Sequence, residues 1–162
     1  MTSRLDIQPG QGQWMLSGAI DETSQLIELL GRAQAGVLVL DLAGVTFINS
    51  LGVRDWIRMQ GEAGRQHVAI ELRRVAEPII HQLNMIIATR GTATVTSFYA
   101  PYACDACGRE ESLLIDAVAH AAGLAQLQAP PMPCPECGAQ MAFNDFPERY
   151  FSFLVPESPH SG

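Results

Sequence analysis

One stretch, from Val37 to Gly52, constrains the fold more than any other part of the sequence. It opens with a continuous apolar run over 37–40, which Asp41 ends. Such a run is typical of a strand buried on both faces of a mostly parallel sheet. A short loop follows, and Asn49 and Ser50 are residue types that favour the start of a helix. Because apolar residues then recur at helical spacing, the stretch predicts a strand, a loop and a helix that carries a serine hydroxyl at its N-terminus.

Ser50 allows two interpretations at this position. It could act as a helix cap, by accepting a hydrogen bond from its own helix. Alternatively it could carry a phosphate, because unpaired backbone N–H groups and the helix dipole favour an anion there. A phosphate would place new negative charge on an exposed surface.

Residues 41–53 resemble the signature of the STAS domain, a family that includes anti-sigma factor antagonists and the cytoplasmic ends of sulfate transporters. The family pattern is approximately D-L-S-x-x-x-F-[ML]-D-S-[ST]-G-[LV]. The residues that match it are Asp41, Leu42, Phe47, Ser50, Gly52 and Val53. Asn49 and Leu51 depart from it, since the family usually has Asp at the first of these positions and commonly Ser or Thr at the second.

The resemblance implies a bacterial regulatory protein whose Ser50 is phosphorylated by a partner, an anti-sigma factor or related serine kinase of the ATPase fold. Phosphorylation would then decide whether the partner is bound. The contact surface implied by the family comprises Asn49, Ser50, Leu51, Gly52 and Arg54.

The remainder of the first hundred residues predicts alternating strands and helices. A hairpin is expected over 3–8 and 14–18, and residues 16–20 also resemble the second strand of STAS domains. A helix should begin at Asp21, with its apolar stripe over 26–33, and the Ser50 helix should run to about Ala63. A strand over 67–73, a helix over 76–87 and a strand over 92–98 complete the series. We therefore expect an α/β fold for residues 1–98, a STAS-like mixed β-sheet with helices packed mainly on one face.

Four cysteines occur as two Cys-x-x-Cys-Gly pairs, Cys104 with Cys107 and Cys134 with Cys137. The glycine permits a positive φ, so that a backbone N–H can reach a sulfur. Two such knuckles predict a closed, structural site of four thiolates around one metal ion. A thioredoxin-like redox pair is disfavoured because neither pair follows a strand of a βαβ unit. With four cysteines present, His120 is expected on the surface rather than as a ligand.

The identity of the ion has two candidates. The knuckles resemble those of rubredoxin, in which the ion is iron, but thiolate sites bind zinc more tightly than ferrous iron. We therefore expect a small C-terminal zinc-ribbon module over residues 99–155, with a helix over 111–123 between the pairs and a disordered tail over 156–162.

Five aromatic residues follow the second knuckle. The favoured interpretation is that they dock the zinc module onto the sheet, and the alternative is an exposed patch that binds a partner. These residues are Phe143, Phe146, Tyr150, Phe151 and Phe153.

The charge balance limits the possible partners. The chain has 17 acidic and 10 basic residues, a net charge of −7. Four thiolates and one zinc ion would bring it to about −9. This balance argues against nucleic acid or an anionic membrane as the main partner.

The sequence also indicates where the protein is located and whether it is an enzyme. No stretch approaches the roughly 20 apolar residues that span a bilayer, and the N-terminus lacks the apolar region of a signal peptide. The cysteine pairs suit a reducing compartment, so a cytoplasmic location is expected. The sequence contains no nucleophile elbow, P-loop or dinucleotide fingerprint, and we expect no enzymatic activity.

The sequence thus predicts an anti-sigma factor antagonist-like module switched at Ser50. The alternative is a phosphorylation-independent scaffold that uses the STAS domain and the zinc ribbon to join partners in a signalling complex. A nucleic-acid adaptor is disfavoured by the acidic charge.

Overall fold

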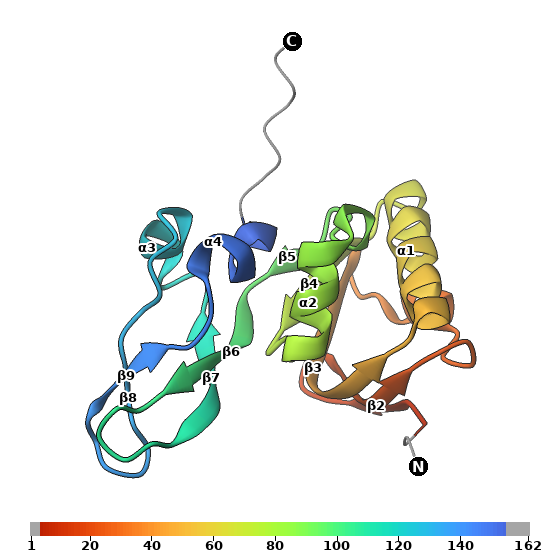
Figure 1. The fold of residues 1–162 in the computed structure, drawn as a ribbon. Coiled ribbons are helices and arrows are strands. Elements are labelled where there is room, and N and C mark those ends of the chain that lie inside the picture. Colours follow the sequence, from red (N-terminus) through yellow and green to blue (C-terminus); the bar gives the residue numbers. More distant parts are fainter. Residues whose placement is uncertain (1–3, 155–162) are drawn as a thin grey trace.

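The computed structural model describes residues 4–154, so the tail expected over 156–162 lies outside the described residues. The chain forms two sheets with helices beside them, an α/β arrangement (Figure 1). The first sheet has the strand order β1-β2-β3-β4-β5, and the second has the order β7-β6-β9-β8. None of the helices within the described range is long and apolar enough to cross a membrane.

The first sheet is mixed, as the sequence predicts. β1 pairs with β2 as an antiparallel hairpin, and the remaining neighbours pair in parallel. Its strands are β1 (Asp6–Pro9), β2 (Trp14–Ile20), β3 (Val37–Ile48), β4 (Ala69–Arg73) and β5 (Thr94–Val95).

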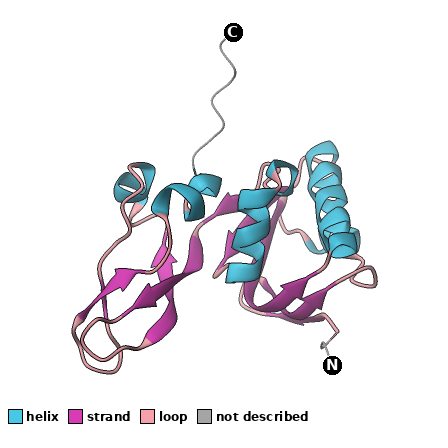
Figure 2. Ribbon diagram, viewed as in Figure 1, coloured by secondary structure: helices cyan, strands magenta, loops and turns pink. Residues whose placement is uncertain are grey.

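The helices of this region connect its parallel strands. Because β2 to β5 follow one another in the same direction across the sheet, right-handed crossovers place the connecting helices on one face. Figure 2 shows α1 and α2 on that face. The elements are the 3₁₀ helix η1 (Leu26–Arg32), α1 (Ser50–Arg65), α2 (Glu77–Met85) and the 3₁₀ helix η2 (Ile87–Thr89). The strongly buried Leu38, Leu40, Trp56 and Met59 form the core between sheet and helices.

β3 is longer than the sequence predicts. The prediction that Asp41 ends the strand is wrong, because β3 continues to Ile48. Asp41 is only 3% exposed, and its carboxylate accepts hydrogen bonds from Arg74 Nε at 2.7 Å and from the Ala43 backbone N–H at 3.0 Å. These partners compensate for the loss of hydration, so a charged residue is tolerated in mid-strand.

The helix predicted from Asp21 is a 3₁₀ helix that begins only at Leu26. The Asp21 carboxylate instead closes a turn, where its Oδ1 atom accepts hydrogen bonds from the Thr23 backbone N–H at 2.8 Å and hydroxyl at 2.6 Å. The backbone N–H of Leu26 donates to Asp55 Oδ2 at 2.9 Å, which ties η1 to α1. α1 itself continues to Arg65, two residues beyond the predicted end.

The second sheet and its helices span residues 97–154, here called the cysteine module. The strand predicted over 92–98 is divided, because β5 ends at Val95 and a new strand enters the second sheet. The helix predicted over 111–123 is wrong: this segment is a strand followed by a turn and a short helix. The elements are β6 (Ser97–Ala103), β7 (Glu110–Asp116), α3 (Ala121–Ala125), β8 (Met132–Pro133), β9 (Gln140–Phe143), α4 (Pro147–Tyr150) and the 3₁₀ helix η3 (Ser152–Leu154).

An aromatic cluster joins the cysteine module to the first sheet. Phe98 is fully buried, and its ring lies 5.1 to 6.4 Å from the rings of Tyr150, Phe151 and Phe153. The Asn84 side chain of α2 donates to the Tyr150 carbonyl at 2.8 Å. The docking interpretation is therefore confirmed for Tyr150 and for Phe153, whose backbone N–H donates to Asn84 Oδ1 at 2.9 Å, whereas Phe143 stacks on Phe151 at 4.8 Å within the cysteine module itself. Phe146 is the exception, since it is 64% exposed.

Candidate functional site

The four cysteines lie in two knuckles with the same backbone geometry. In the first, the Cys104 N–H donates to the Arg109 carbonyl at 2.8 Å, and the Gly108 N–H donates to the Cys104 carbonyl at 2.8 Å. Gly108 has φ of 77°, a conformation that favours glycine. The tight turn brings Cys104 and Cys107 to one side of the loop.

The second knuckle repeats this pattern. The Cys134 N–H donates to the Ala139 carbonyl at 2.7 Å, and the Gly138 N–H donates to the Cys134 carbonyl at 2.9 Å. Gly138 also has φ of 77°. Two independently positioned loops therefore present matching pairs of thiols.

The sulfur atoms of Cys104, Cys107, Cys134 and Cys137 all lie within 4.8 Å of one another. Two cross-knuckle separations are shorter, 3.5 Å between Cys104 and Cys137 and 3.7 Å between Cys107 and Cys134. A tetrahedral ion with metal–sulfur bonds of about 2.3 Å requires sulfur separations of roughly 3.8 Å. The prediction that these four residues form one cluster is confirmed, and the cluster fits a metal ion.

The thiols do not ionise equally well in this arrangement. Backbone N–H groups of Cys137 and Glu136 lower the pKa of Cys134 to about 7. The Arg109 N–H favours the thiolate of Cys107, but desolvation and the other thiols outweigh it and raise the pKa of Cys107 to about 12. Four thiolates this close repel one another unless a cation lies between them. The donor set is therefore suited to a metal ion.

Charged neighbours surround the cluster. Arg109 Nε donates to Glu111 at 2.9 Å, and another guanidinium nitrogen lies 3.6 Å from Glu136 of the second knuckle. Cys104 and Cys134 are buried, whereas Cys107 and Cys137 are exposed at the tip. His120 is exposed and precedes α3, as expected, and is not part of the cluster.

The second candidate site is the start of α1. The capping interpretation of Ser50 is wrong, because Asn49 is the N-cap and its Oδ1 accepts from the Gly52 N–H at 2.7 Å. Asn49 Nδ2 also donates to Glu22 at 3.1 Å. Ser50 is the first residue of the helix and is exposed. Its hydroxyl is thus not needed for the cap.

The other residues expected at this surface differ in exposure. Leu51 is 48% exposed and Arg54 is exposed. Gly52 is buried, and a Cβ at this position would lie 2.4 Å from the Ile20 carbonyl oxygen. Gly52 therefore allows α1 to approach β2, and the surface around Ser50 is formed by its neighbours.

Two residues of this surface were not identified from the sequence. Phe47, which matches the signature but was not expected at the contact surface, is 48% exposed just before the helix. Arg58 is exposed one turn after Arg54. The spacing of four residues on a helix is the signal that could have revealed Arg58.

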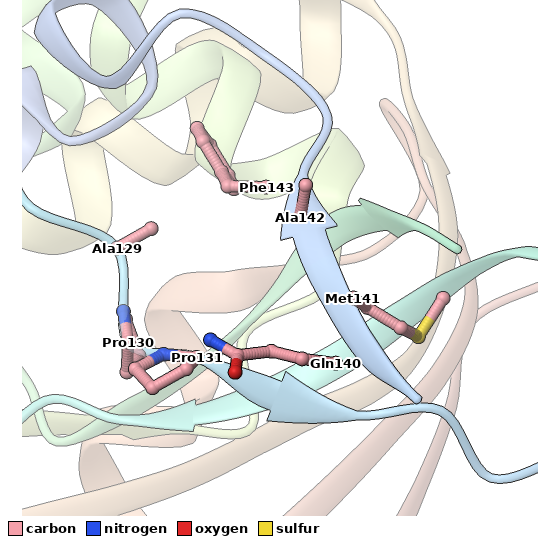
Figure 3. A pocket seen from close by; sticks show the side chains of 7 residues that line it. All are labelled: Ala129, Pro130, Pro131, Gln140, Met141, Ala142 and Phe143. Carbon is pink, nitrogen blue, oxygen red and sulfur yellow. The ribbon is translucent and has the colours of Figure 1, made fainter. Parts of the chain in front are cut away.

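An open groove of about 490 Å³ lies beside β8 and β9 (Figure 3). Its lining residues contribute one polar side chain, the amide of Gln140, and no titratable group. They are Ala129, Pro130, Pro131, Gln140, Met141, Ala142 and Phe143. This lining offers no acid, base or nucleophile.

Neither a protein-family model nor a curated protein matches this sequence. The resemblance to the STAS domain therefore remains a prediction from the residues of 41–53.

Proposed function

We propose that this chain is a regulatory protein-interaction module with a STAS-like first sheet, switched by phosphorylation of Ser50 and completed by a structural zinc ion. The observation that carries the proposal is the exposed Ser50 hydroxyl at the first residue of α1, beside a cap that Asn49 supplies alone. A serine that the helix does not use for capping can be modified without loss of the helix.

A phosphate suits this position electrostatically. It would add about −1.5 to −2 charges at neutral pH. The positive end of the helix dipole stabilises such a charge. Arg54 lies four residues further along the same face, where it could pair with the phosphate.

The same phosphate would oppose partner binding. Phe47 and Leu51 flank Ser50, and each is 48% exposed. A partner that covers these side chains would also have to remove water from the phosphate, which is costly. The unmodified protein would therefore bind its partner, an anti-sigma factor or related serine kinase of the ATPase fold, and the phosphorylated protein would release it.

Zinc is the ion that the cysteine cluster supports best. Four sulfurs with knuckle geometry form a closed set of ligands, which is the pattern of structural zinc sites. When bound, zinc would supply folding free energy to the module. Thiols kept for a metal rather than a disulfide suit the cytoplasm. We propose no enzymatic activity for either site.

A phosphorylation-independent scaffold is the second candidate function. The departures from the family signature at Asn49 and Leu51 favour it. In that case partners would bind both sheets, and Ser50 would have no special role.

A pull-down from the native cell lysate distinguishes the two proposed functions. The baits are Ser50→Ala, Ser50→Asp and a control, Thr92→Asp, which adds a carboxylate at an exposed turn beside Gln60, about 15 Å along α1 from Ser50. The switch predicts a kinase-like partner retained by Ser50→Ala and by the control but lost by Ser50→Asp. It also predicts that this partner phosphorylates the wild-type protein at Ser50. Identical partners on all three baits would contradict the switch and support the scaffold.

A further inference from the structure

Two exposed arginines of α1 have no charged partner within the described residues. All ten basic residues are arginines. Five pair with carboxylates, Arg90 donates to a backbone carbonyl, and Arg32 lies over the Trp14 ring at 4.6 Å. Within residues 4–154, the remaining three, Arg4, Arg54 and Arg58, take part in no ion pair and no side-chain hydrogen bond, and of these Arg54 and Arg58 lie on the same helix.

These arginines share a helical face with an exposed apolar side chain. Leu51, Arg54 and Arg58 are spaced at i, i+3 and i+7, which places them in one stripe. Phe47, as exposed as Leu51, precedes the stripe. We call Leu51, Arg54 and Arg58 the basic stripe. Although the whole chain has a net charge of −7, this exposed surface is positive, and charge complementarity favours an acidic partner for it.

The cysteine module carries the opposite charge. Residues 97–154 contain seven acidic side chains and two arginines, a net charge of −5. Four thiolates and a divalent ion would lower this value to about −7. The acidic excess of the chain is thus concentrated at one end.

A groove of about 410 Å³ lies between the two sheets, beside this acidic region. The one charged residue in its lining is Glu77. The lining comprises Ala43, Val45, Thr46, Ala76, Glu77, Pro78, Tyr99 and Ser112.

The exposed face of β7 extends the groove. Glu110, Ser112, Leu114 and Asp116 alternate along that face, and Leu114 is 40% exposed directly opposite Tyr99. Glu77, Glu110 and Asp116 form no ion pair within the described residues. Arg74, near Tyr99, is already paired with Asp41. The groove is therefore apolar with an acidic rim.

We propose that the basic stripe of one molecule docks into this acidic-rimmed groove of a second copy. Leu51 would enter the apolar floor, while Arg54 and Arg58 would face Glu77 and Glu110. An amphipathic helix laid in an apolar groove is a common mode of recognition.

The geometry favours contact between copies rather than within one. In a single molecule α1 lies at the far side of the first sheet from β7 (Figure 1). Because the two surfaces are different, the interface is heterologous, and repetition of it gives rings or open chains. Docking needs no phosphate on Ser50, and a phosphate beside Leu51 would oppose it.

Charge exchange tests the interface with the protein alone. One variant is Arg54→Glu with Arg58→Glu, and the other is Glu77→Arg with Glu110→Arg. Each variant then has two surfaces of the same sign, but the two variants complement each other. Arg4→Glu and Glu148→Arg, at exposed positions on neither surface, are the controls for charge reversal at an unrelated site.

Sedimentation equilibrium at concentrations up to about 1 mM detects contacts even of millimolar affinity. The Debye length falls from about 10 Å at 0.1 M salt to about 3 Å at 1 M. We expect the wild type and both controls to associate at the lower salt and to weaken about tenfold or more at the higher salt. Each charge-reversed variant should remain monomeric, and an equal mixture of the two should associate.

Three outcomes would overturn the proposal. One is a wild-type protein that stays monomeric at the lower salt. The second is a failed charge exchange, in which a charge-reversed variant still associates alone or an equal mixture of the two variants does not associate. Circular dichroism checks that each variant is folded. The third is monomeric protein that sediments with phosphatidylserine vesicles through Arg54 and Arg58, which would assign the stripe to a lipid surface.

Discussion

The two sheets of this protein differ in the helices that cover them and in the residues they bury. The first sheet is covered by α1 and α2, and its core includes the strongly buried Leu38, Leu40 and Trp56. The second sheet has only two short helices and a 3₁₀ turn, and two of its strongly buried residues are metal-ligand candidates, Cys104 and Cys134. A region with so small a core needs an additional cross-link. We therefore expect the first sheet to be stabilised mainly by its own apolar core and the second to depend in addition on an ion held by the cysteine cluster.

The two regions are nevertheless in contact. Phe98 belongs to β6 but packs with the aromatic residues that dock on α2. The buried apolar residues form one continuous cluster across both sheets. The ion should therefore be essential for the cysteine module and helpful, but not essential, for the first sheet.

Loss of the ion should have the largest effect. Cys104→Ser removes a buried ligand, and structural zinc supplies apparent binding free energies of roughly 10–16 kcal/mol. We expect metal content to fall from one ion per chain to none, and the cysteine module to become sensitive to proteolysis. Ala106→Ser, in the same loop, is the control. A metal-free variant with an intact cysteine module would remove the contrast between the two regions.

Truncation of Phe98, the buried aromatic residue where the two regions meet, should cause the second-largest loss of stability. Phe98→Ala leaves a cavity between the regions and should destabilise the protein by about 3–5 kcal/mol in denaturant unfolding. Phe146→Ala removes a 64% exposed ring and should change stability by less than about 0.5 kcal/mol. Similar losses for the two variants would show that the aromatic cluster does not join the regions.

Adding a methyl group where α1 meets β2 should have a smaller effect on the free energy of unfolding. Gly52→Ala brings a Cβ to 2.4 Å from the Ile20 carbonyl, and overpacking of this kind costs about 1–3 kcal/mol. Gly61→Ala, in the same helix, has only the Arg65 side chain nearby and should stabilise by about 0.5–1 kcal/mol. Thermal unfolding separates the two outcomes, and a neutral Gly52→Ala would mean that α1 can move away from β2.

The smallest effect concerns the helix cap. Asn49→Ala should cost about 1 kcal/mol, because the Gly52 N–H loses its acceptor. Ser50→Ala should leave stability nearly unchanged. The reverse order of stabilities in thermal unfolding would restore Ser50 as the cap and weaken the case for its modification.

The sequence was most informative where the signals are local. The Cys-x-x-Cys-Gly spacing predicts the cysteine cluster, and the mixed order of strands and helices up to α2 follows from periodicity. Both signals depend only on neighbouring residues, so they need no knowledge of distant contacts.

Distant contacts decided the predictions that are wrong. β7 contains Leu113, Leu114 and Ile115 in a row, a run compatible with a helix or a strand, and its pairing with β6 along seven residues selects the strand. Arg74 is 33 residues from Asp41 in the chain, so the ion pair that keeps Asp41 within β3 has no local signal. Asn49 and Ser50 are equally good caps by type, and only the backbone path at the end of β3 selects Asn49.

Hydrogen exchange with and without a metal chelator tests the contrast between the two regions most directly, because it measures both at once. We expect chelation to remove protection from the amides of β6, β7 and β9, while those of β3 and α1 stay protected. Uniform loss of protection across both sheets, or no loss in the second, would contradict this expectation.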